Sequence, residues 1–115
     1  VVKISEIVRH TEAKISAGNL SDDKNMDKAF SSDLMSDVLT LDEENILLIS
    51  GLANVQLIRT AEMADISAVL LARNKKATPD MIELANENGL IILETPYSIY
   101  KASGVLYANG LREVY

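Results

Sequence analysis

The chain has 115 residues with one histidine, no cysteine and a formal net charge of −6 at pH 7. The lack of cysteine excludes disulfides, thiolate metal sites and cysteine nucleophiles, and one histidine cannot build a multi-histidine metal site. The acidic balance argues against nucleic-acid and anionic-membrane partners, because binding to phosphates requires a basic surface.

The N-terminal part of the chain holds most of the acidic residues and is expected to form short elements. Residues 1–45 carry ten Asp and Glu residues against five Lys and Arg residues. Apolar residues at helical spacing predict a helix over 5–11. A short alternating run that ends before a turn predicts a strand over 13–16.

A second strand is expected over 26–30, after a polar segment that reads as a turn. Successive side chains of a strand point to opposite faces of the sheet. We therefore expect Met26 and Phe30 to lie on one face of this strand and Ala29 to lie on the other.

The next segment, 31–40, predicts a helix that begins at Ser31 or Ser32 as its N-cap. Helical spacing separates its apolar residues from its polar ones. The apolar stripe, which we expect to face the core, consists of Leu34, Met35, Val38 and Leu39. The opposite, polar stripe consists of Ser32, Asp33, Ser36 and Asp37.

An apolar run over 46–50 stops at Gly51 and leads into a helical pattern opened by Asn54. A continuous apolar run of this length is typical of a strand buried on both faces, as in a parallel sheet. The strand–helix unit recurs twice, with strands over 66–71 and 90–93 before helices opened by Thr78 and Ser98. The tail over 111–115 either adds a short edge strand or lies loose.

Three strand–helix units in succession define an α/β fold, because right-handed crossovers place the helices on the faces of a parallel sheet. We expect one domain over 1–115. Its predicted architecture is a three-layer α/β/α sandwich with a mainly parallel sheet of about five strands. The strand over 46–50 should lie inside this sheet rather than at an edge, since both of its faces are apolar.

The sequence lacks the usual signatures of nucleotide and membrane binding. Gly51-Leu52-Ala53-Asn54 contains one glycine where phosphate-binding and dinucleotide-binding motifs need several. No stretch approaches the roughly 20 apolar residues of a membrane span, and no cleavable leader is recognisable. We therefore expect a cytoplasmic protein that binds no membrane, no nucleic acid and no cofactor.

Asp33 and Asp37 stand one helical turn apart in the predicted helix. Carboxylates at this spacing can share a Mg²⁺ ion or shift each other's pKa for acid–base chemistry. A solvated helix face explains the same spacing, because like charges at this separation cost only about a few tenths of a kcal/mol. We favour the solvated face and predict no catalytic residue and no metal site.

Two surfaces are candidates for a protein interface. The first is formed by the tyrosines of the C-terminal helical region, because exposed aromatic side chains suit protein contacts. These tyrosines are Tyr97, Tyr100 and Tyr107. The second is the polar stripe of the helix predicted over 31–40, which contains Ser32, Asp33, Ser36 and Asp37.

A small-molecule site, if the domain has one, is expected at the carboxyl ends of the strands. Open α/β sheets bind ligands at this edge, where the free N–H groups of the following helices favour an anion. Small and polar residues there leave room and offer hydrogen bonds, and Arg73 supplies a positive charge. The predicted ligand-binding residues are Ser50, Gly51, Asn54, Gln56, Arg73, Thr95 and Ser98.

Three stretches of the chain resemble the DRTGG domain family. Residues 29–38, with the sequence AFSSDLMSDV, are similar to the GYASDLLSDV segment of these domains. Residues 49–63 resemble the central strand and helix of stand-alone members, and 95–110 resemble the closing helix with its GxLYxxGL ending. The diglycine that gives the family its name should fall near Lys28 and Ala29, and neither of these is glycine.

The resemblance implies an accessory regulatory module, as at the front of HPr kinase/phosphorylase or within clostridial CBS-domain pyrophosphatases. Some stand-alone members are encoded beside hydrogenase and signalling components, so a protein of that kind is a candidate partner. Three readings of function follow. We favour a non-catalytic regulatory or interaction module that acts as a homodimer. The alternatives are a sensor of an anionic metabolite or nucleotide, and an enzyme that works through carboxylates and a metal.

Overall fold

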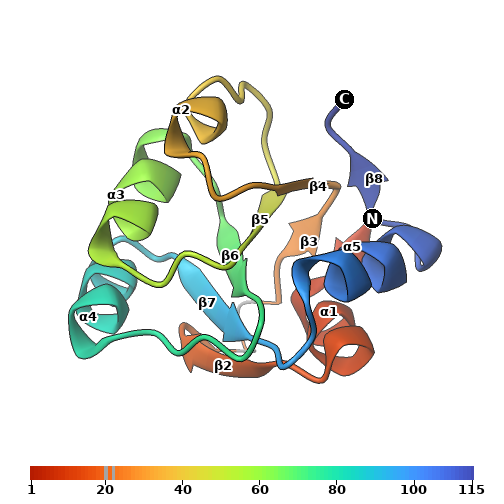
Figure 1. Ribbon diagram of the computed structural model, residues 1–115, viewed down its shortest axis with the longest axis horizontal. Coiled ribbons are helices and arrows are strands. Elements are labelled where there is room, and N and C mark those ends of the chain that lie inside the picture. The colour runs from red at the N-terminus through yellow and green to blue at the C-terminus, as the bar shows by residue number, and fades with distance from the viewer. Residues whose placement is uncertain (20, 22) are drawn as a thin grey trace.

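The structure is a computed structural model that describes residues 1–19, 21 and 23–115. It contains a six-stranded sheet in the order β2-β7-β6-β5-β4-β8 and a two-stranded sheet made of β1 and β3 (Figure 1). The strands are β1 (Val2–Lys3), β2 (Lys14–Ala17), β3 (Asn25–Met26), β4 (Lys28–Ser31), β5 (Ile46–Ser50), β6 (Ala68–Leu71), β7 (Ile91–Glu94) and β8 (Arg112–Glu113). The helices are α1 (Ile4–Thr11), α2 (Met35–Val38), α3 (Val55–Met63), α4 (Pro79–Glu87) and α5 (Ile99–Ala108).

The large sheet is mainly parallel, as predicted. The strands β7, β6, β5, β4 and β8 run parallel to their neighbours, and only β2 pairs antiparallel, with β7. The sheet has six strands where about five were expected, because the tail adds β8 at the edge beside β4. The α/β fold class is therefore confirmed.

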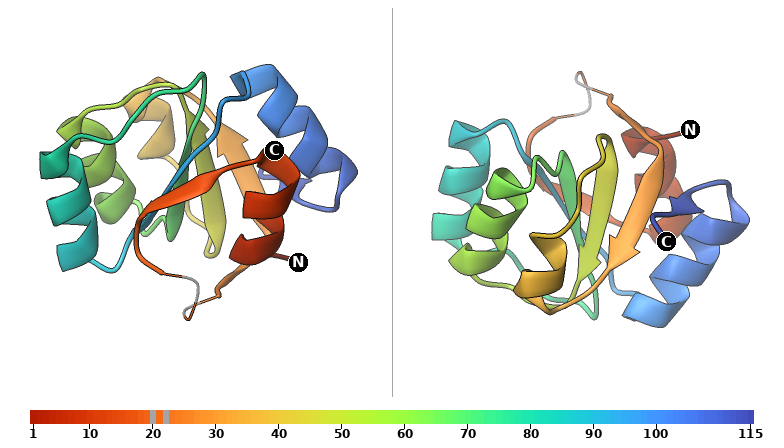
Figure 2. Two further views of the ribbon diagram at one scale, coloured as in Figure 1. Left: turned by 90° about the horizontal axis from the view of Figure 1, so that it is seen from below. Right: turned by 90° about the horizontal axis from the view of Figure 1, so that it is seen from above.

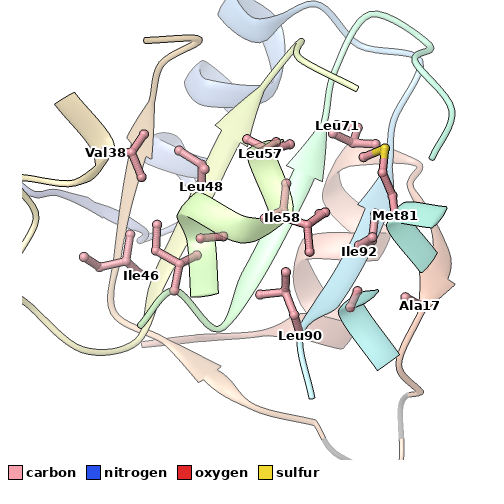
Figure 3. Close-up of a cluster of buried hydrophobic side chains, with 14 of the residues drawn as sticks. Ala17, Val38, Ile46, Leu48, Leu57, Ile58, Leu71, Met81, Leu90 and Ile92 are labelled. Carbon is pink, nitrogen blue, oxygen red and sulfur yellow. The ribbon is translucent and has the colours of Figure 1, made fainter. Parts of the chain in front are cut away.

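Helices cover both faces of the large sheet (Figure 2). The helices α2, α3 and α4 lie on one face, and α1 and α5 lie on the other. Two hydrophobic clusters fill the layers between helices and sheet. The cluster beneath α3 and α4 includes Leu48, Leu57, Ile58 and Met81 (Figure 3). This layering places the amino ends of α3, α4 and α5 beyond the carboxyl ends of β5, β6 and β7.

The strand β5 lies inside the sheet, between β4 and β6. All five of its residues are buried. Ile46 and Leu48 belong to the cluster on the α3 side, and Leu47 and Ile49 belong to the cluster on the α5 side. The prediction of a central strand with two apolar faces is confirmed.

The helices predicted to open at Asn54, at Thr78 and near Ser98 do begin there, and these three residues are their N-caps. The Asn54 side chain accepts the Leu57 N–H at 3.0 Å, and the Ser98 hydroxyl accepts the Lys101 N–H at the same distance. The Thr78 hydroxyl accepts the Met81 N–H at 3.2 Å. Each cap satisfies one of the free N–H groups in the first turn of its helix.

The strand predicted over 26–30 is in fact two strands of different sheets. Asp27 interrupts it, since β3 pairs with β1 whereas β4 pairs with β5. The prediction for its faces was wrong: Met26 and Ala29 contact the cluster on the α5 side, and Phe30 contacts the cluster on the α3 side. Simple alternation fails here because the chain changes sheets at Asp27.

The helix predicted over 31–40 is much shorter. Ser31 extends β4, where it is paired with Ile49, and Ser32 is not the N-cap of a helix. The helix α2 comprises only Met35–Val38. Val38 is buried as predicted, but Leu34 and Leu39 are exposed, which corrects the expectation for the apolar stripe. Pairing with β5 holds the backbone extended through Ser31, so the helix cannot begin at the serines.

Candidate functional site

The carboxyl ends of the parallel strands meet at one edge of the sheet. In the strand register, Ser31 of β4 lies beside Ile49 of β5, and Ser50 of β5 lies beside Leu71 of β6. Leu71 in turn lies beside Glu94 of β7. The helices α3, α4 and α5 begin after β5, β6 and β7, so their free N–H groups and positive dipole ends lie toward this edge.

Asp33 lies between β4 and α2, and its carboxylate reaches the turn between β5 and α3. One oxygen of its carboxylate accepts the Ser50 hydroxyl at 2.7 Å and the Gly51 N–H at 2.8 Å. The Ser50 oxygen in turn accepts the Leu52 N–H at 3.2 Å. An acidic side chain of the protein itself therefore occupies the place where an anion would meet these donors.

The charge of Asp33 is stabilised by this arrangement. The hydrogen bond from the Ser50 hydroxyl lowers the pKa of Asp33 most. Partial burial acts in the opposite direction, and the Gly51 N–H and the positive charge of Arg73 lower the pKa further. Together they hold the pKa of the Asp33 carboxyl below its ordinary value of 3.8. Asp33 is thus an ionised acceptor at neutral pH.

The guanidinium of Arg73 covers Gly51. A Cβ atom added at Gly51 would lie 2.9 Å from Nη2 of Arg73, so a larger residue would displace this side chain. Arg73 itself is exposed. Glycine is needed at position 51 for this close approach rather than for a left-handed backbone, since Gly51 is not among the glycines with positive φ.

A tight turn holds Arg73 in place. Arg73 and Asn74 have φ angles of 58° and 60°, and the Lys75 N–H donates to the Ala72 carbonyl at 3.2 Å, which is the pattern of a type I′ turn. The Arg73 N–H donates to the Tyr97 carbonyl at 2.7 Å. The backbone of Arg73 is therefore fixed between β6 and the loop after β7.

The remaining predicted ligand-binding residues are already engaged within the protein. Asn54 and Ser98 cap their helices. The buried Thr95 hydroxyl donates to the Thr11 carbonyl at 2.5 Å and accepts the Tyr97 N–H at 3.1 Å. Gln56 is exposed and donates to the Thr60 hydroxyl at 3.4 Å. The structure brings Ser50, Gly51 and Arg73 together and gives Thr95 a structural role.

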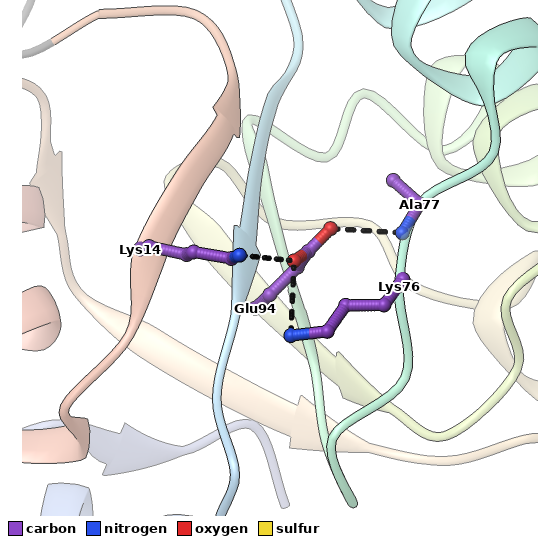
Figure 4. A network of polar contacts seen from close by, with 4 residues as sticks. All are labelled: Lys14, Lys76, Ala77 and Glu94. Carbon is purple, nitrogen blue, oxygen red and sulfur yellow. Dashed lines mark hydrogen bonds and ion pairs between the residues drawn. The ribbon is translucent and has the colours of Figure 1, made fainter.

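Glu94 lies at the same edge and is a buried acidic residue. It was not predicted from the sequence as a residue of the site. Its Oε2 accepts the Ala77 N–H at 2.8 Å, and Oε1 lies 3.7 Å from the Lys76 nitrogen and 3.9 Å from the Lys14 nitrogen (Figure 4). Burial acts to raise the pKa of Glu94, but the Ser16 hydroxyl, the Ala77 N–H and the two lysines outweigh it and hold the pKa below 4.5. Glu94 thereby fastens the loop before α4 to the sheet.

The tyrosines predicted as interface residues divide into two kinds. Tyr100 and Tyr107 on α5 are 90% and 52% exposed. Tyr97 is half-buried, and its hydroxyl donates to Glu12 at 2.6 Å, which raises the pKa of that hydroxyl above 10.0. Lys101 lies 4.0 Å above the Tyr97 ring. Tyr97 therefore joins α1 to α5, while the other two face outward.

The residues of the polar stripe predicted over 31–40 also differ: some contact the rest of the domain and others face outward. Asp33 turns toward Ser50 and Gly51, as described above, whereas Ser36 and Asp37 are exposed on α2. The Ser32 hydroxyl accepts the Leu34 N–H at 2.9 Å. In the part of the chain that the structure describes, no group of three or more acidic or histidine side chains is placed to hold a metal ion.

Among the described residues, several surface hollows are lined by residues other than Asp33, Ser50, Gly51 and Arg73. One, of about 520 Å³, lies over α5 and is lined by Tyr100, Lys101, Ser103, Gly104, Val105 and Tyr107. Another, of about 340 Å³, lies between the ends of α2 and α3. Within the described residues, no helix has the length and apolar character needed to cross a membrane.

The sequence matches the model of the DRTGG domain over residues 6–108, and the chain belongs to the DRTGG domain family. The resemblance seen in the sequence is therefore confirmed. Lys28 and Ala29, near which the family's diglycine was expected, are paired residues of β4.

A solved structure with this fold is that of the CBS and DRTGG domains of the regulatory region of Clostridium perfringens pyrophosphatase, complexed with the activator diadenosine tetraphosphate. The TM-score is 0.74 and the sequence identity is 16%. The match covers 90% of this chain and 45% of that chain, so this chain spans less than half of its length. At this identity the likeness concerns the fold. The search of curated proteins gave no match.

Proposed function

We propose that this DRTGG domain is a cytoplasmic regulatory module without catalysis of its own, and that it acts as a homodimer through α5. The family and the fold support a regulatory role, since the DRTGG domain of the clostridial pyrophosphatase belongs to a regulatory region. A protein of a signalling or hydrogenase system is the kind of partner that such a module would control.

The observation that carries the homodimer is the outer face of α5. Tyr100, Gly104 and Tyr107 follow one another at helical spacing, so they form one stripe on the helix. Apart from its two chain neighbours and the backbone of its own helix, no atom of the described residues lies within 4 Å of a Cβ built at Gly104. A second helix can therefore approach the backbone closely between the two tyrosines.

This stripe is self-complementary about a two-fold axis. Tyr100 and Tyr107 are separated by about 10 Å along the helix, and their midpoint lies between Ser103 and Gly104. If two copies of α5 cross antiparallel at that midpoint, Tyr100 of each copy faces Tyr107 of the other. A symmetric dimer needs such a surface, because each contact occurs twice.

The acidic residues favour a regulatory module over a carboxylate enzyme. Asp33 is held by Ser50 and Gly51, and Glu94 is held by Ala77 and two lysines. An acid–base residue has to reach a substrate, whereas both of these carboxylates are committed to partners within the chain.

Light scattering after size exclusion, at micromolar concentration, tests the homodimer. The wild-type chain should have the mass of two copies, and Tyr100→Ser with Tyr107→Ser should have the mass of one. Tyr115→Ser is the matched control, because Tyr115 is also exposed but lies outside α5. A wild-type monomer, or a dimer that persists in the double variant, would refute the proposal.

A second candidate function is the sensing of an anionic metabolite or nucleotide at the carboxyl edge. The exposed guanidinium of Arg73 above Gly51, next to the amino end of α3, is the observation that favours it. The related clostridial regulatory region was solved with diadenosine tetraphosphate, which is an anionic nucleotide. The residues proposed for this site are Ser50, Gly51, Asn54, Gln56, Arg73, Thr95 and Ser98.

A further inference from the structure

A groove at the amino edge of the sheet is separate from α5 and from the carboxyl edge. It lies at the carboxyl ends of α2 and α3, and its volume is about 340 Å³. Its lining residues are Leu39, Leu41, Asp42, Glu43, Glu44, Met63, Ala64 and Asp65. We define these residues as the acidic groove.

The acidic groove exposes large apolar side chains. Leu39 is 50% exposed and Met63 is 64% exposed, although Leu39 was expected to face the core. Leu41, which lies in the same lining, is buried and packs into the cluster on the α3 side. Exposed apolar side chains beside a hollow offer an apolar partner a surface on which to pack.

The charge of the groove is negative. Among the described residues that line it, four are acidic and none is basic. Glu43 is paired with Lys28, whereas the side chains of Asp42, Glu44 and Asp65 have no ion pair or hydrogen bond in the part of the chain that the structure describes. The last turn of α3 holds no basic residue, so its free carbonyl groups add to the negative potential.

The spaced carboxylates of the groove suit several basic side chains better than a single metal ion. Metal ions require three or more ligands close together, and the described carboxylates are not gathered in that way. A second acidic groove of another copy would bring the same carboxylates and would be repelled. A chain segment with alternating apolar and basic residues matches both features of the groove.

We infer that the acidic groove binds a basic amphipathic segment of a partner protein. An apolar side chain of the partner packs on Leu39 and Met63, and its Lys or Arg residues face Asp42, Glu44 and Asp65. This inference does not depend on the homodimer, because the groove and α5 share no residue.

The test uses a synthetic helical peptide of alternating leucine and lysine pairs, titrated into the ¹⁵N-labelled chain. Binding should shift the amide signals of Leu39, Met63 and Asp65, and it should weaken as salt is added. The same peptide with glutamate in place of lysine should cause no shift. Shifts at α4 or α5 instead, or concentration-dependent shifts of the groove without peptide, would refute the inference.

Two pairs of variants separate specific binding from general attraction. Asp42→Asn with Glu44→Gln should weaken binding about five- to tenfold, since two charge pairs are lost. Glu83→Gln with Glu87→Gln changes the net charge equally, but on α4, and should have no more than about a twofold effect. Met63→Ser should weaken binding, whereas Tyr115→Ser should not, because Tyr115 is exposed but lies outside both the groove and α5. Equal losses in the two charge variants would overturn the inference.

Discussion

Asp33 and Gly51 lie 18 positions apart in the sequence, and a carboxylate oxygen of Asp33 accepts the Gly51 N–H at 2.8 Å. The same oxygen accepts the hydroxyl of Ser50, which is buried. This contact joins the segment after β4 to the turn after β5. It therefore fixes the turn from which α3 starts and places a negative charge beside Arg73.

Asp33→Ala should reduce the free energy of unfolding by about 1–2 kcal/mol, because the Ser50 hydroxyl and the Gly51 N–H lose their acceptor. Urea denaturation measures the change. Asp37→Ala is the control, since the Asp37 side chain makes no hydrogen bond among the described residues, and it should change stability by less than about 0.5 kcal/mol. Equal losses in the two variants would show that Asp33 is only a surface charge.

The stability that Asp33 contributes should depend on pH. Its pKa is lower in the folded protein than its ordinary value of 3.8, chiefly because of the Ser50 hydroxyl. The folded state therefore holds this proton less tightly than the unfolded state, and the contribution is present above pH 3.8 and is lost as the pH falls through the folded pKa. Thermal melts should show that wild type and Asp33→Asn converge in acid. A difference that is constant with pH would contradict this.

Leu48→Lys should unfold the domain. Leu48 is fully buried in the centre of the sheet, and a buried unpaired charge costs several kcal/mol against a total stability of roughly 5–15 kcal/mol. Leu34→Lys is the matched control, because Leu34 is exposed at the start of α2 and a lysine there remains in water. Circular dichroism should show a folded control and an unfolded Leu48→Lys. A folded Leu48→Lys would contradict the burial of β5.

The parts of the fold that could be predicted are those fixed by local signals. The apolar run of β5 and the caps Asn54, Thr78 and Ser98 act through neighbouring residues, so their effect can be read from the sequence. The length of α2 could not be predicted, since Ser31 is held extended by its pairing with β5 and that pairing is a tertiary contact. Tertiary contact overrides helix propensity here.

The candidate site was predicted only in part for the same reason. Gly51 and Arg73 were named because they follow apolar strands, and the structure brings them together. The role of Asp33 was missed because its partner lies 18 positions away. Glu94 was missed because it extends β7 beyond the predicted strand, at a buried position where an acidic residue is uncommon.

The last prediction concerns the anionic-ligand site proposed at the carboxyl edge, where two opposite charges should control binding. The guanidinium of Arg73 attracts an anion, and the carboxylate of Asp33 repels it while occupying the Gly51 N–H. Calorimetric titration with diadenosine tetraphosphate, and with inorganic phosphate for comparison, measures the affinity. Arg73→Ala should weaken binding at least about tenfold, because a charged hydrogen-bond donor is lost.

Three further variants make this prediction specific. Lys75→Ala removes the same charge from the same loop and should have a smaller effect, because Lys75 does not cover Gly51. Gly51→Ala should also weaken binding, because its Cβ would lie 2.9 Å from Nη2 of Arg73 and displace the guanidinium. Asp33→Asn should strengthen binding, since it removes a negative charge from the site. Thermal melts check that each variant is folded. If wild type binds neither ligand, or if Arg73→Ala binds as tightly as wild type, the site is not at this edge.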